Sequence, residues 1–276
     1  MKKINFLSLF LLIWLPSQVI AEKLRLTIHP YLTAQELMTK FMPLVDYLTV
    51  ETGLDIELMI SADYEQHVEQ LGKNQIDVAY VGPFLYVKLI RDYGEKPLLA
   101  RLEINGRPTF RGAIVTGQSR EKIGQLSHLI GKRFAFGSKE STMGYLVPYY
   151  LLKQEGIDLE QLAYYEFLGS HDNVAMSVLM GEFDAGAVME DIFYKYQEKG
   201  LNLLALTPEI SEHLFATRSD LPQEQIEKLR QALLSILQHP DSKTVLAAIK
   251  SNLTNFVPVT DSDYDSLRII MNHMEQ

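Results

Sequence analysis

Cysteine is absent from this chain of 276 residues. Without thiols the protein can form no disulfide framework, so its stability must come from an apolar core. The same absence excludes a cysteine nucleophile, a thiolate zinc site and a lipid-modified cysteine. The composition, which is 47% hydrophobic, is typical of a globular protein.

Common catalytic and nucleotide-binding motifs are also missing. The sequence contains no Gly-x-Ser-x-Gly, no His-Glu-x-x-His, no Walker A loop and no Gly-x-Gly-x-x-Gly. Its 7 histidines show no metal-ligand spacing. We therefore expect neither a metal site nor a cofactor, and the sequence disfavours an enzyme.

Positive charge is scarcer than negative charge, and the formal net charge is −9. An acidic chain is a poor partner for nucleic acid or for an anionic membrane, because both attract basic surfaces. It can still bind a small anion, because local hydrogen-bond donors outweigh the net charge at close range. The sequence has no low-complexity segment, heptad pattern or internal repeat, and we expect a monomer.

Residues 1–21 have the pattern of a secretory signal peptide. Lys2 and Lys3 precede an apolar run over 6–15, and Ala21 ends a short cleavage motif. The run is too short for a membrane span, which needs about 20 apolar residues; an uncleaved anchor is the alternative. Cleavage would leave about 255 residues with a formal charge of about −11, free in the periplasm.

Strands alternate with helices along the rest of the chain. Apolar patterns predict strands at 24–28, 56–60, 76–81, 98–104, 110–116, 134–136, 163–168, 184–189, 201–206 and 214–217. Helical spacing predicts helices between them, with three more at 223–238, 242–250 and 262–274. This order implies an α/β fold with mostly parallel sheets.

Two of these strands suggest a division of the chain. If 110–116 and 214–217 are crossings between two lobes, the first lobe contains 22–110 plus 214–276 and the second contains 111–213. The residue pattern itself predicts the α/β alternation, whereas the two-lobe division is an inference from where these strands fall.

Several strand-to-helix junctions carry residues suited to ligand binding, at 61–64, 80–83, 138–144, 169–172 and 190–191. In open α/β sheets, ligands bind beyond the carboxyl ends of the strands. These junctions should therefore lie on the same side of their sheets. Two lobes that face each other there would enclose a cleft.

The junction at 138–144 has the features of an anion site. Ser141 and Thr142 occupy positions typical of helix N-caps, and a helix is predicted from about Gly144. Free backbone N–H groups at a helix start, with two hydroxyls beside them, can bind a tetrahedral anion. Glycine would let that ligand approach the backbone closely. An ordinary capped helix is the alternative interpretation.

Other junctions hold further polar candidates. His171 opens a predicted helix, where it could donate to an anion or simply cap the helix. Glu190 and Asp191 could hold a cationic group or favour a helix dipole. Tyr64 could donate its hydroxyl proton to a ligand or pack in the core. The residues alone leave these alternatives open.

Three segments occur in a specific order along the chain. They are Asp77-Val-Ala-Tyr-Val-Gly-Pro-Phe84, the run from Phe134 with Ser141-Thr-Met-Gly-Tyr-Leu-Val-Pro148, and Gly169-Ser-His-Asp-Asn-Val-Ala175 continuing to Val188. Together they resemble the periplasmic phosphonate/phosphite/phosphate-binding proteins of ABC transporters. The resemblance covers essentially the whole mature chain. It implies the type II periplasmic binding-protein fold, with two α/β lobes and a hinge of two crossing strands.

The resemblance also implies a ligand site built from both lobes, made of Tyr64, Tyr80, Ser141, Thr142, Met143, Gly144, His171 and Glu190. In such a site hydroxyls and helix-start N–H groups hold the phosphonate-like oxygens, and the histidine adds a donor. Two positions depart from the family pattern. Phe110 replaces a tyrosine at the first hinge strand, and only Glu212 could serve as the acidic residue that aminoalkyl-phosphonate binders carry.

The implied function is capture of a small phosphorus oxyanion (phosphonate, phosphite or phosphate) and its delivery to an inner-membrane ABC permease. A ligand-sensing subunit for a membrane histidine kinase would have the same sequence features. Enzymes on this fold resemble thiaminase or porphobilinogen deaminase and depend on a cysteine, which this chain lacks.

Overall fold

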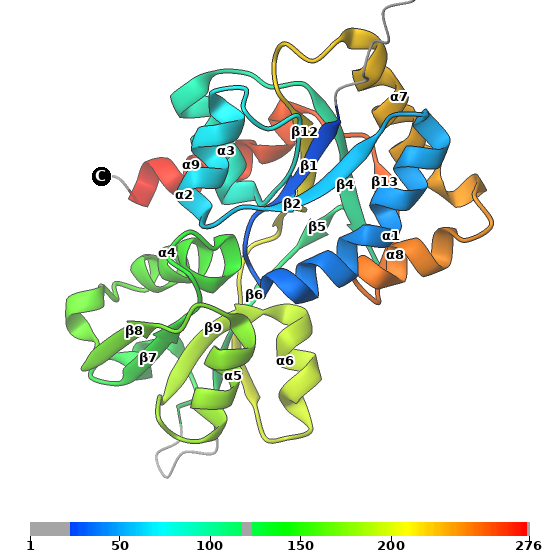
Figure 1. Ribbon diagram of the computed structural model, residues 1–276. Helices are drawn as coiled ribbons and strands as arrows, with labels where there is room; N and C mark the ends of the chain where they lie inside the picture. Colours follow the sequence, from blue (N-terminus) through cyan, green and yellow to red (C-terminus); the bar gives the residue numbers. More distant parts are fainter. Residues whose placement is uncertain (1–22, 118–122, 275–276) are drawn as a thin grey trace, which may run out of the picture.

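The computed structural model describes residues 23–117 and 123–274. The predicted signal peptide, 1–21, lies outside the described residues. The described chain forms two α/β lobes (Figure 1). The first lobe is built on a six-stranded sheet and the second on a five-stranded sheet, and a two-stranded sheet lies where the chain passes between them.

The sheet of the first lobe has the order β13-β4-β12-β3-β1-β2. Its strands are β1 (Leu24–Ile28), β2 (Ile56–Ile60), β3 (Val78–Val81), β4 (Leu98–Ile104), β12 (Leu214–Thr217) and β13 (Leu253–Val257). One face is covered by α1 (Ala34–Thr52), α7 (Gln223–Leu234) and α8 (Ser242–Ile249), and the other by α2 (Tyr64–Gly72), α3 (Pro83–Tyr93) and α9 (Asp265–Met274). Successive side chains of β3 point to opposite faces of the sheet, so Tyr80 packs with the first set of helices and Ala79 with the second.

The sheet of the second lobe has the order β10-β6-β9-β7-β8. Its strands are β6 (Gly112–Thr116), β7 (Arg133–Phe136), β8 (Tyr164–Phe167), β9 (Ala185–Met189) and β10 (Asn202–Leu206). Helices α5 (His171–Leu179) and α6 (Glu190–Gln197) pack on one face, and α4 (Val147–Gln154) packs on the other. Both lobes are therefore three-layered.

The sheets are mixed, which corrects the expectation of mostly parallel sheets. β1 is parallel to β2 and β3, and β7 is parallel to β8 and β9. In contrast, β12 and β6 run antiparallel to both of their neighbours. Each of these two strands arrives from the other lobe. Because the lobes face each other at the carboxyl ends of the parallel strands, a chain that enters from that side runs in the opposite direction.

The predicted strand at 110–116 is divided between two sheets. β5 (Thr109–Phe110) pairs with β11 (Ile210–Ser211), whereas β6 belongs to the second lobe. The two passages of the chain between the lobes therefore lie side by side. On this basis we propose the predicted lobe limits, 22–110 plus 214–276 and 111–213.

β13 is the one strand of the large sheets that lies outside every predicted segment among the described residues. It is an edge strand, and only Leu253 and Phe256 are buried. Its short, polar pattern does not stand out in the sequence. The other predicted strands lie within about two residues of their expected limits.

Apolar residues before and at the start of α4 pack against the first lobe. Met143, Leu146 and Val147 share an apolar cluster with Leu85 of α3 and with Tyr264. Burial of these side chains holds the preceding turn against the N-terminus of α3.

Candidate functional site

A cavity of about 520 Å³ lies between the two lobes. All the strand-to-helix junctions identified in the sequence contribute to its lining, through residues that include Tyr64, Tyr80, Ser141, His171 and Asp191. The cleft predicted from those junctions is therefore present in the structure.

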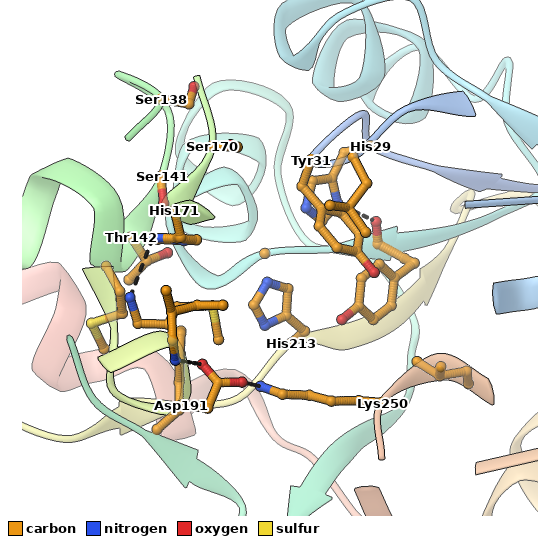
Figure 2. A pocket seen from close by; sticks show the side chains of 18 of the residues that line it. His29, Tyr31, Ser138, Ser141, Thr142, Ser170, His171, Asp191, His213 and Lys250 are labelled. Atoms are coloured by element: carbon orange, nitrogen blue, oxygen red, sulfur yellow. Dashed lines mark hydrogen bonds and ion pairs between the residues drawn. The ribbon is translucent and has the colours of Figure 1, made fainter. Parts of the chain in front are cut away.

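Most of the predicted site residues line this cavity, namely Tyr64, Tyr80, Ser141, Thr142, Met143 and His171. Gly144 and Glu190 do not. Figure 2 shows the serine and threonine side chains and His171 on one wall, and His29 and Tyr31 on the opposite wall.

Two hydroxyl groups of the second lobe have their oxygen atoms already engaged. Oγ of Ser141 accepts a hydrogen bond of 2.9 Å from the backbone N–H of Gly144. Oγ1 of Thr142 accepts one of 3.1 Å from the N–H of Phe84, at the start of α3 in the first lobe. A hydroxyl that accepts a backbone hydrogen bond still has its own proton to donate. Both side chains therefore offer O–H donors at the cavity.

The turn after Ser141 is π-helical over Thr142–Leu146 and continues into α4. Among the described residues, the N–H groups of Thr142 and Met143 make no backbone hydrogen bond, as expected at a helix start. Both groups are available to an anion. The Met143 side chain is buried in the apolar cluster, so only its backbone can contribute.

His171 contributes a donor in its neutral form. Its Nδ1 accepts a hydrogen bond of 3.2 Å from the backbone N–H of Met189, so the ring proton is on Nε2. Burial lowers the pKa of His171 to about 4. The imidazole is therefore uncharged at neutral pH, and it donates through Nε2 without the protonation that the sequence analysis considered.

Two tyrosines enter from the first lobe. Burial, together with the Glu140 carboxylate, raises the pKa of Tyr64 to about 12, so its hydroxyl remains a donor. Tyr80 is buried, and its ring stacks on those of His29 and His213, with ring centroids 5.5 and 5.3 Å apart.

Gly144 and Glu190 have structural contacts elsewhere. The N–H of Gly137 donates to the carbonyl of Gly144 over 2.8 Å, and a Cβ on Gly144 would lie 3.1 Å from Cα of Gly137. The small residue at 144 therefore permits close backbone packing. Glu190 forms a bidentate ion pair of 2.7 and 3.1 Å with Arg111, and it lines a second cavity of about 360 Å³.

Sequence analysis missed His29, Tyr31 and His213, which line the cavity from the first lobe and the segment leading into it. His29 directly follows β1, so the junction rule could have identified it. His213 lies between β11 and β12, where no local pattern marks a ligand site.

An ion pair connects the two lobes at the cavity. Nζ of Lys250, which follows α8, lies 2.8 Å from a carboxylate oxygen of Asp191 in α6 (Figure 2). Within residues 23–117 and 123–274, no group of histidine and acidic side chains is arranged to hold a metal ion. None of the helices in these ranges is long and apolar enough to cross a membrane.

Residues 26–264 match the model of a family described as "ABC transporter, phosphonate, periplasmic substrate-binding protein". The chain is 26% identical over 270 residues to the phosphate-import protein PhnD of Mycolicibacterium smegmatis, covering 90% of this chain and 84% of that protein. It is 25% identical over 217 residues to a probable ABC transporter phosphite-binding protein, PhnD1, of Prochlorococcus marinus, covering 74% and 67%.

The fold is shared with the solved structure of Prochlorococcus marinus PhnD1 in complex with methylphosphonate. The TM-score is 0.80 at 22% identity, over 92% of this chain and 98% of that chain. The predicted two-lobed binding-protein fold is confirmed. Because the family model spans most of the sequence, this chain belongs to the periplasmic substrate-binding proteins of phosphonate ABC transporters.

Proposed function

We propose that this protein captures a small phosphorus oxyanion in the cleft between its lobes. The observation that carries the proposal is the set of neutral donors on the second lobe: the hydroxyls of Ser141 and Thr142, and Nε2–H of His171. Preorganised donors in a partly enclosed site suit a tetrahedral anion. The relatives named for phosphate import and phosphite binding, and the methylphosphonate complex, support the same class of ligand.

The ligand-loaded protein would then dock on a membrane permease in the periplasm as a monomer, without making or breaking a bond. Closure of the lobes around the anion would present a permease with a surface that the open form lacks. Sedimentation analysis of the mature protein, with and without ligand, tests whether the protein is a monomer. Uptake by a permease reconstituted in proteoliposomes tests whether the protein delivers its ligand to the membrane.

The first test is calorimetric titration of the mature protein with phosphate, phosphite, methylphosphonate, 2-aminoethylphosphonate and sulfate. We expect micromolar or tighter binding of at least one phosphorus oxyanion, and no binding of sulfate. Ser141→Ala should weaken that binding by about 1–3 kcal/mol if its hydroxyl contacts the anion. A matched serine outside the cavity, Ser127→Ala, should leave the affinity unchanged. If none of these compounds binds, the proposal is wrong.

A further inference from the structure

The two walls of the cavity differ in hydrogen-bond polarity. On the second lobe, four of the polar side chains that line the cavity have an acceptor atom already occupied by a backbone N–H group. Besides Ser141, Thr142 and His171, this holds for Ser170, whose Oγ accepts from the N–H of Asn173 over 3.2 Å. These side chains can still donate their own protons to a ligand. We call Ser141, Thr142, Ser170 and His171 the donor wall.

On the other side of the cavity, His29 has the reverse arrangement. Its Nδ1 lies 3.0 Å from the carbonyl oxygen of Tyr80. A carbonyl can only accept, so Nδ1 carries the ring proton and Nε2 of the neutral ring has a free lone pair. Burial, with the neighbouring rings of His67 and His213, keeps the pKa of His29 well below its usual value. The ring is therefore neutral.

His213 is arranged in the same way by Glu212. Both the backbone N–H and Nδ1 of His213 lie 3.0 Å from Oε2 of Glu212. Burial acts to raise the pKa of Glu212, but its interactions with His213 and Lys250 outweigh burial and leave the pKa below its usual value. An ionised carboxylate can only accept, so Nδ1 of His213 carries a proton, and this tautomer leaves the lone pair of the uncharged imidazole on Nε2.

Nε2 of His213 lies at the cavity. It makes no hydrogen bond within the described residues, and a Cβ built on Gly82 would lie 3.5 Å from it. Figure 2 shows the ring of His213 between the donor wall and the side chains of His29 and Tyr31. His29 and His213 together form the acceptor side of the cavity.

The cations that line the cavity already have partners. Lys250 pairs with Asp191, Lys195 pairs with Asp172, and Nζ of Lys40 donates to a backbone carbonyl. No arginine of the described chain is among the lining residues. Carboxylates neutralise two of these three lysines, so most of the groups that can donate to the ligand are neutral. This favours a singly charged anion over a doubly charged one.

We propose that the cleft selects oxyanions that retain one acidic proton, with that O–H donating to Nε2 of His213 while the remaining oxygens accept from the donor wall. The inference rests on the proposed function and narrows it to hydrogen phosphonates, hydrogen phosphite and hydrogen phosphates. Phosphorus oxyanions keep such a proton near neutral pH, since their second pKa is about 6 or higher. Sulfate and alkylsulfonates do not, so one of their oxygens would face the nitrogen lone pair. A site built to pair a ligand O–H rejects analogues without it by large factors.

Methylphosphonate and methanesulfonate test the proposal, because the singly protonated phosphonate has the same tetrahedral shape and the same charge as the sulfonate. Calorimetry at pH 7 should show at least 100-fold tighter binding of methylphosphonate. Methyl methylphosphonate, an ester that has the charge but no O–H, should bind as poorly as the sulfonate. If both analogues bind as tightly as methylphosphonate, the inference is wrong and the proposed function stands. If no phosphorus oxyanion binds, both are wrong.

Two variants locate the effect at Nε2 of His213. His213→Asn keeps a donor near the position of Nδ1 for Glu212 and deletes Nε2. Gly82→Ala keeps the histidine and covers Nε2 with a methyl group at ordinary contact distance. Each should reduce the phosphonate-to-sulfonate ratio at least tenfold, through loss of phosphonate affinity. His128→Asn, at an exposed histidine outside the cavity, is the matched control. An unchanged ratio in both variants, with folding verified by circular dichroism, would overturn the assignment.

Discussion

The backbone N–H of Met189, at the end of β9, donates a hydrogen bond of 3.2 Å to Nδ1 of His171, at the start of α5. This single contact determines which ring nitrogen carries the proton. It turns the histidine into a neutral donor whose Nε2–H is available to a ligand.

The effect of a substitution at His171 on oxyanion affinity should therefore depend on which ring nitrogen the new side chain imitates. Glutamine places an amide N–H near the position of Nε2, whereas asparagine reaches only the position of Nδ1. We expect His171→Asn to weaken oxyanion binding by about 1–3 kcal/mol, the usual cost of a lost donor to a charged group, and His171→Gln to weaken it less. Calorimetry on both variants checks the order. Equal affinities for the asparagine variant and the wild type would remove His171 from the site.

Buried His67 should make the protein less stable in mild acid. Its ring is fully buried, its Nδ1 lies 2.8 Å from Oγ of Ser61, and burial lowers its pKa to about 4. Unfolding returns the histidine to a pKa of about 6.5, so the unfolded chain binds an extra proton between about pH 6.5 and pH 4. Stability is complete above that window and falls as the pH drops through it, by up to about 3 kcal/mol.

Urea unfolding at pH 7 and pH 4.5 measures this loss. His67→Asn should lower stability at pH 7 but should lose less on acidification than the wild type, because it has no group to titrate. His128→Asn, at an exposed histidine, should follow the wild-type pH dependence. Parallel pH profiles for the wild type and His67→Asn would contradict the assignment.

Thr142 should have two separable roles. Its Oγ1 accepts from the N–H of Phe84 in the other lobe, and its hydroxyl proton faces the cavity. Thr142→Ser keeps both functions. Thr142→Val removes both and leaves the Phe84 N–H without a partner, so we expect it to lower the ligand-free unfolding free energy by about 1 kcal/mol as well as weaken oxyanion binding. A valine variant as stable as the serine variant would show that the contact between the lobes contributes nothing.

The ion pair between Lys250 and Asp191 should favour the closed arrangement of the lobes. The side chains of Lys250 and Asp191 are 24% and 34% exposed, and ion pairs near the protein surface contribute about 0.2–1 kcal/mol and weaken with salt. Lys250→Met and Asp191→Asn should therefore each lower ligand affinity by less than about fivefold, and the loss should shrink in 1 M salt. A double-mutant cycle isolates the pair, and Lys228→Met, which breaks an exposed pair with Glu224, is the control. Additive effects in the cycle would show that the two side chains do not act together.

Local sequence patterns predicted most of the helices and strands, although not β13, and the positions of the strand-to-helix junctions. Apolar periodicity, helix caps and turns depend on neighbouring residues, so they can be recognised in the sequence. Ser141, Thr142 and His171 could be identified for that reason. The pairing of the strands, including the antiparallel direction of β6 and β12, became visible only in the folded protein. The same is true of the ion pair that holds Glu190 on Arg111, away from the cavity. The meeting of His29, Tyr80 and His213 likewise joins segments far apart in the chain. Contacts of this kind depend on long-range packing, which leaves no local pattern in the sequence.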